Sequence, residues 1–222
     1  MFVRFTQVTI TILLLFVLPG VVWFESIGNL LTDFRPSSMP GQNLYLFSKL
    51  MGLYVIIFLW LQVTYGLTRN DRLLGLPLWT KKRHQYLGIT TFVMIVLHVS
   101  FFVLAVSIRK NTFAVGLLFP NFDGFYHTML SVGWFALVMV IAVISARVMR
   151  EKLNFNWIWM HRLSLPALFL GLTHGLMIGS EATMGALFYL YISLGVITAL
   201  LLFKRFVNFV SSKTVRICNN NG

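Results

Sequence analysis

Long apolar runs alternate with short polar or basic segments along the whole chain. Each run approaches or exceeds the roughly 20 residues that an α-helix needs to cross a hydrocarbon core about 30 Å thick. The pattern therefore predicts an all-α membrane protein, a six-transmembrane-helix bundle forming a single domain over residues 1–222. The predicted spans are residues 5–24, 44–67, 84–106, 129–148, 158–179 and 184–203.

The first apolar run has a second interpretation, a cleaved signal peptide. It is long, ends in Trp23 and Phe24, and carries no small-x-small cleavage pattern, so a retained helix is favoured. The segment between the third and fourth spans, residues 107–128, is the longest loop after the second span and is partly apolar. We expect it to lie on the membrane surface. A short polar tail is expected after the sixth span.

Composition agrees with a membrane protein. The chain is 58% hydrophobic and 11% charged, whereas soluble domains carry about 25% charged residues. The formal net charge of +12 would suit nucleic-acid binding. However, the basic residues lie at the ends of apolar runs rather than along one face, so nucleic acid is excluded as a partner. The single cysteine, Cys218, excludes an internal disulfide.

Lysine and arginine indicate how the spans are oriented. Cytoplasmic loops of membrane proteins carry an excess of these two residue types. The segments after the second, fourth and sixth spans are basic, whereas the loops on the opposite side hold only Arg35, Arg109 and Lys110. Both termini are therefore expected in the cytoplasm. The third and fifth spans would then run in the same direction.

Four of the five histidines lie in just two spans. His84 and His98 are 14 residues apart in the third span, and His161 and His174 are 13 residues apart in the fifth. At about 1.5 Å per residue, each pair covers roughly 20 Å along its helix. In parallel helices His84 would face His161 at one depth, and His98 would face His174 at another. Histidine is costly inside a membrane, which makes all four candidates for function.

The surrounding residues indicate what these histidines could bind. The third and fifth spans contain no carboxylate and no cysteine, which disfavours zinc and di-iron sites. Two neutral imidazoles from facing helices suit a six-coordinate heme iron, and this ligation favours electron transfer over oxygen binding. Small residues such as Gly88 and Gly171 would leave room for a macrocycle, although they equally serve helix packing.

Two cations and one proline complete this prediction. Arg162, expected to be buried, and Lys49 are candidates to pair with heme propionates, and snorkelling is the alternative role for Lys49. Thirteen steps of about 100° leave His161 and His174 about 140° apart around an ideal helix. The fifth span must therefore be interrupted if both face the third span, and Pro166 is predicted to interrupt it.

At these residues the chain resembles a known family. The stretches LTRNDRLLGLPLWTKKRHQYLGITTFVMIVLH and WMHRLSLPALFLGLTHG look like the transmembrane domain of ferric reductases and NADPH oxidases, over roughly residues 44–203. The resemblance implies two hemes b, an inner one on His84 and His161 and an outer one on His98 and His174. It implies electron transfer from a cytoplasmic donor to an outer acceptor, either ferric iron or a periplasmic redox protein. The heme-binding membrane subunit of a periplasmic methionine sulfoxide reductase system belongs to the same broad group, so a bacterial inner (plasma) membrane is expected.

Two departures from the family modify this expectation. The oxidases carry a flavin and nicotinamide domain after the sixth span, whereas this sequence has no glycine-rich nucleotide fingerprint. No FAD or NADPH site is therefore expected, and the donor would be a separate flavoprotein reductase or a quinol. The oxidases also have a further histidine where this chain has Phe102, so dedicated superoxide production is not expected.

The chain would then be an oxidoreductase component that needs a separate donor, with no residue assigned as catalytic. Two alternatives stay open. One is a heme-free proton channel or transporter that uses the intramembrane histidines. The other is a membrane anchor for a partner enzyme, in which heme serves only assembly.

Overall fold

The computed structural model describes residues 17–26, 39–68, 81–153, 156–179, 182 and 185–220, without the side chains of 81–83, 153 and 212–220. Within this part of the chain the regular structure is helical and no strand occurs. The elements are α2 (Leu18–Ser26), α4 (Gln42–Thr68), α5 (Lys81–Lys110), η2 (Val115–Leu118), α6 (Gly124–Val148), α7 (Arg150–Leu153), α8 (Asn156–Arg162), α9 (Ser164–Ile178) and α10 (Gly185–Asn220). Most of the predicted first span and the basic segment 69–80 lie outside the described residues.

Four of the described helices are long and apolar enough to cross a membrane. They are α4, α5 from His84 onward, α6, and α10 as far as Ser211. They correspond to the predicted second, third, fourth and sixth spans. A helix satisfies its own backbone hydrogen bonds, which a segment in hydrocarbon must do. The all-helical membrane class is thus confirmed.

Two helix boundaries differ from the prediction. α6 begins at Gly124 rather than at residue 129, and so takes in the end of the predicted loop. α10 does not end near residue 203 but continues to Asn220. Neither proline nor glycine occurs between Val196 and Asn220, so nothing in the sequence interrupts that helix.

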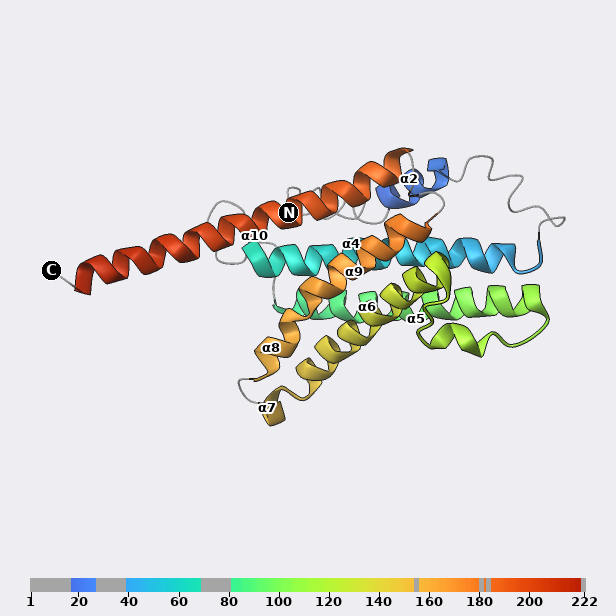
Figure 1. Ribbon diagram of the computed structural model, residues 1–222, viewed down its shortest axis with the longest axis horizontal. Coiled ribbons are helices and arrows are strands. Elements are labelled where there is room, and N and C mark those ends of the chain that lie inside the picture. Colours follow the sequence, from blue (N-terminus) through green and yellow to red (C-terminus); the bar gives the residue numbers. More distant parts are fainter. Residues whose placement is uncertain are drawn as a thin grey trace, which may run out of the picture.

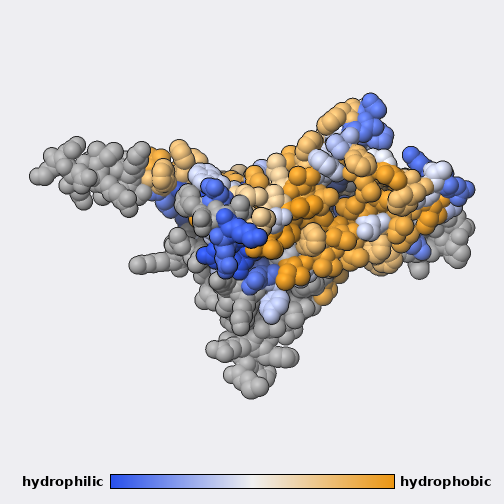
Figure 2. Space-filling view, turned by 90° about the horizontal axis from the view of Figure 1, so that it is seen from below, coloured by the Kyte–Doolittle hydropathy of each residue, from blue (hydrophilic) through white to orange (hydrophobic). Residues whose placement is uncertain are grey.

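The helices form a bundle around α4 (Figure 1). α4 and α5 are antiparallel neighbours, α9 packs between α4 and α6, and α10 lies along α4 and extends beyond the bundle. The Trp60 indole Nε1–H donates to Leu194 O at 3.0 Å and ties α4 to α10. Phe58 of α4 and Leu168 of α9 are fully buried in the core. Figure 2 shows an apolar surface band with polar patches toward both ends, as a membrane-embedded bundle requires.

The predicted fifth span is two helices, α8 and α9, joined at Leu163. Pro166 has no N–H to donate to the carbonyl of Arg162, and its ring collides with that carbonyl in a regular helix. The break lies at this point, because Leu163 N–H donates to Met160 O at 3.1 Å, one residue short of the α-helical step. The prediction that Pro166 interrupts the span is confirmed, with the break three residues before the proline.

Candidate functional site

The four histidines of the predicted third and fifth spans meet as two pairs. The ring centroids of His84 and His161 are 6.0 Å apart, and those of His98 and His174 are 6.4 Å apart. Each pair joins α5 to one half of the broken fifth span. α5 and α8–α9 therefore run in the same direction, and the partners are those predicted from the sequence.

These separations fit two imidazoles on opposite sides of one metal ion. A metal–imidazole bond of about 2 Å and roughly 1.2 Å from nitrogen to ring centroid place two trans imidazole centroids about 6.4 Å apart. Among the described residues, no three His, Cys, Asp or Glu side chains gather to hold a metal ion. The donor set therefore fits a group that brings its own equatorial ligands and takes only two axial ones from the protein.

Both outer histidines are fixed by backbone carbonyls. His98 Nδ1–H donates to Ser48 O at 2.8 Å, and His174 Nδ1–H donates to Met129 O at 2.8 Å. Because a carbonyl only accepts hydrogen bonds, each ring carries its proton on Nδ1 and keeps a lone pair on Nε2. Metal-ligating histidines are usually oriented by such a bond from their other nitrogen. The Ser48 hydroxyl also donates to His98 O at 2.8 Å.

Two glycines make room for the outer histidine rings because they have no side chain. A Cβ atom at Gly133 would lie 2.6 Å from His174 Nδ1, and one at Gly52 would lie 3.0 Å from His98 Nδ1. Both glycines are thus required by close approach. Neither glycine was singled out from the sequence. Of the small residues that were, Gly88 borders the cavity at the inner pair and Gly171 borders the cavity at the outer pair.

The outer pair borders a cavity of about 250 Å³ enclosed mainly by α4, α5, α6 and α9. For comparison, an engineered cavity of about 150 Å³ admits benzene. The outer cavity can therefore accept a planar ligand larger than a single aromatic ring. Its wall is mainly apolar, with Tyr45, Lys49 and Tyr126 among its polar members.

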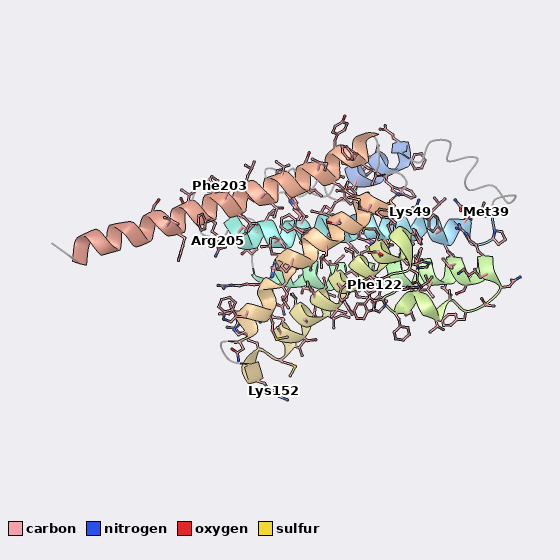
Figure 3. The ribbon with its side chains drawn as sticks, viewed as in Figure 1. Met39, Lys49, Phe122, Lys152, Phe203 and Arg205 are labelled. Atoms are coloured by element: carbon pink, nitrogen blue, oxygen red, sulfur yellow. The ribbon has the colours of Figure 1, made fainter. Side chains whose placement is uncertain are left out.

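Two cations lie over one ring at this cavity. Lys49 Nζ is 4.5 Å and Arg109 Cζ is 4.8 Å from the centroid of Tyr45. Arg109 is held there because its Nη2–H donates to Gln42 Oε1 at 2.6 Å and its Nε–H to Pro40 O at 3.3 Å. The predicted Lys49 lines the outer cavity, and Figure 3 labels its side chain. Arg109, which the sequence did not single out, does not line the cavity but reaches the same Tyr45 ring from an exposed position.

The inner pair borders a second cavity of only about 50 Å³. The Tyr65 ring lies 5.7 Å from His84, and the Trp157 ring lies 6.0 Å from His161. Gln62 Nε2–H donates to Thr91 Oγ1 at 2.8 Å in the cavity wall. The inner imidazoles are spaced like the outer ones. A macrocycle between them requires the side chains of the wall to move apart.

Arg162 differs from its prediction. It is exposed, and its guanidinium carbon lies 4.4 Å from the ring centroid of Trp159, which is itself 59% exposed. The expected burial is wrong because the side chain at this end of α8 packs on an exposed surface ring and does not line the inner cavity. Arg162 is therefore a weaker propionate candidate than Lys49.

Aliphatic side chains separate the two cavities. Leu59 of α4 and Val140 of α6 border both of them and are 6% and 7% exposed. Phe92 and Phe169 lie between the histidines of their helices in the sequence. They are 38% and 37% exposed, on the outside of the bundle, and do not separate the cavities.

No protein-family model, curated protein or solved structure matches the chain.

Proposed function

We propose that the chain is a transmembrane electron-transfer protein that holds two hemes b. The inner heme would take His84 and His161 as axial ligands, and the outer heme would take His98 and His174. The observation that carries the proposal is that the bundle holds two histidine pairs, one above the other along its helices. The ring centroids are 6.0 Å apart within one pair and 6.4 Å apart within the other. When bound, heme supplies reversible one-electron chemistry at its iron.

The protein's own groups orient and close each site. Two histidines at each iron would leave no open position there, which favours electron transfer over substrate binding at the metal. The carbonyls of Ser48 and Met129 hold the outer rings in the tautomer that presents Nε2. Lys49, with Arg109 beside it, supplies positive charge for the acidic groups of an outer cofactor. Arg162 could do so at the inner end only by leaving the face of Trp159.

The aliphatic wall between the cavities favours electron transfer over proton transfer between the two histidine pairs. His84 and His98 are 14 residues apart on α5, or about 21 Å along the helix. Leu59 and Val140 offer no hydrogen-bonding side chain in the space between the pairs. A proton path needs a chain of such groups, so this wall weighs against the proton channel or transporter.

The direction of transfer follows from the proposed topology. Six spans with both termini in the cytoplasm put the inner pair on the basic side. The donor there would be a flavoprotein reductase or a quinol, and the outer acceptor would be ferric iron or a periplasmic protein. The proposed location is a bacterial inner membrane. In intact cells, a membrane-impermeant maleimide should label Cys218 only after the membrane is permeabilised.

The deciding experiment is a heme assay on the whole chain, purified in mild detergent from heme-replete cells. The reduced-minus-oxidised spectrum should be that of heme b, with about two hemes per chain. His98→Ala should remove about half of the heme, whereas His127→Ala, at the fifth histidine, should remove none. A well-folded but colourless preparation would sink the proposal.

A further inference from the structure

Four phenylalanines are exposed on the segment that joins α5 to α6 and on the first turn of α6. Phe113, Phe119, Phe122 and Phe125 are 66%, 65%, 62% and 61% exposed. We call residues 111–125 the aromatic loop. Soluble proteins rarely expose a large contiguous apolar patch, and such a patch generally marks an interaction surface. Whether water, lipid or another protein surrounds this loop therefore bears on its function.

The aromatic loop folds back along the bundle rather than projecting from its end (Figure 1). Asn121 N–H donates to Ser131 Oγ at 2.8 Å, and the Ser131 hydroxyl donates to Asn121 O at 2.6 Å. Trp134 Nε1–H donates to Leu118 O at 3.0 Å. Ser131 lies seven residues after Gly124, which is about 10 Å into α6. The loop thus reaches a level inside the end of a helix that is long and apolar enough to span the membrane.

The protein supplies hydrogen-bond partners for more than half of the N–H groups of the loop. Water would satisfy exposed peptide groups, but hydrocarbon cannot, so irregular backbone enters a membrane only where the protein supplies the partners. Pro120 has no N–H to satisfy. The remaining donations are from Asn111 N–H to Ile108 O, Thr112 N–H to Ser107 O, Ala114 N–H to Ser107 Oγ, Val115 N–H to Phe113 O, Leu117 N–H to Ala114 O, Phe119 N–H to Gly116 O and Asp123 N–H to Asn121 Oδ1.

The exposed rings are continuous with the apolar face of α6. The ring of Phe122 stacks on that of Phe135, with centroids 6.5 Å apart and planes 27° apart. Phe135, Val138 and Ile141 are all exposed along α6, at 40%, 41% and 45%. Figure 3 shows Phe122 on the flank of the bundle, not at its tip. The patch therefore extends the surface that α6 presents to lipid.

We propose that the aromatic loop is immersed in the leaflet that surrounds the outer histidine pair, with its four phenylalanines against acyl chains. Exposed Arg109, Lys110 and Asp123 would mark the adjacent aqueous side. Leu117 and Leu118, in the same loop, line the outer cavity. One wall of that cavity would thus be held at the depth of the lipid interface. The proposal needs no cofactor and stands apart from the proposed function.

The test is the depth of single spin labels in the whole chain. Phe119→Cys and Phe122→Cys, each combined with Cys218→Ser, would carry a nitroxide in phosphatidylcholine–phosphatidylglycerol vesicles. Collisions with oxygen should exceed those with a water-soluble nickel chelate, as at Val138→Cys on α6. Nickel collisions should be several-fold fewer than at Lys110→Cys, the aqueous control.

Two outcomes of the spin-label measurement would overturn the proposal. Easy access of the nickel chelate to both loop positions would indicate a water-facing surface for a soluble partner. Low access of both reagents would indicate a surface covered by protein, such as a second copy of the chain.

A second measurement avoids substitutions altogether. A diazirine-bearing phosphatidylcholine should form adducts within residues 111–125 of the unaltered protein, and adducts on α6 without any in the loop would also overturn it.

Discussion

The outer and inner histidine pairs have nearly the same spacing but are built differently. The outer rings are each fixed by a backbone carbonyl and border a cavity of about 250 Å³. The inner pair borders a cavity of about 50 Å³, and His161 stands on the short helix α8. The outer site is thus organised before any ligand arrives. The inner site depends on how α8 packs.

The largest effect should come from removing one ligand of each pair in turn. His174→Ala should abolish the outer heme and leave about half of the heme, because the inner ligands stand on other turns of the helices. His161→Ala should leave the outer heme. Heme content and low-temperature spectra would measure both. Loss of all heme from each folded variant would mean that the sites are not independent.

A methyl group at Gly133 should disturb the outer site alone. The added Cβ would lie 2.6 Å from His174 Nδ1, so the ring must leave its carbonyl partner. We expect Gly133→Ala to lose most of the outer heme and to keep the inner heme. Gly66→Ala is the matched control, because a Cβ there meets nothing within 4 Å. Equal heme content in the two variants would contradict the close approach at Gly133.

Removing the helix break should act mainly on the inner site. Pro166→Ala restores the N–H that Arg162 O lacks and allows α8 and α9 to join. A continuous helix would rotate His161 away from His84, because 13 residues leave two side chains about 140° apart. The inner heme should therefore be lost or its spectrum shifted, with the outer heme unchanged. The opposite pattern would show that the break serves the outer pair.

The smallest effect should come from Ser48→Ala. The substitution removes the hydroxyl bond to His98 O but keeps the backbone carbonyl that orients Nδ1. One hydrogen bond contributes about 0.5–1.5 kcal/mol, so the outer heme affinity should fall only several-fold. Heme transfer to an apo-globin would measure it. A complete loss of heme would mean that the hydroxyl, rather than the carbonyl, orients the ring.

Sequence alone predicted the partners of the four histidines and the interruption by Pro166. Both follow from quantities that the sequence contains, namely spacing along a helix and the missing N–H of proline. Loop charge predicted parallel helices, and the direction of α5 and α8–α9 agrees with it.

Which side chains point into the bundle, and which point outward, could not be predicted in the same way. A span in lipid is apolar on all sides, so hydrophobic periodicity does not show which face turns inward. Phe92 and Phe169 lie between the histidines in the sequence, for example, and yet both are exposed on the outside of the bundle. Gly52 and Gly133 were missed because each matters through a histidine on a helix distant in sequence.

The aliphatic wall of Leu59 and Val140 has an electrical consequence. Under the proposed function an electron would tunnel past these side chains while no proton accompanied it, so each transfer would move a net charge across the membrane. Moving one charge through 100 mV changes its energy by about 2.3 kcal/mol, and an electron leaving a negative cytoplasm is favoured by that amount. The membrane voltage would thus drive the outward flow of electrons and be discharged by it.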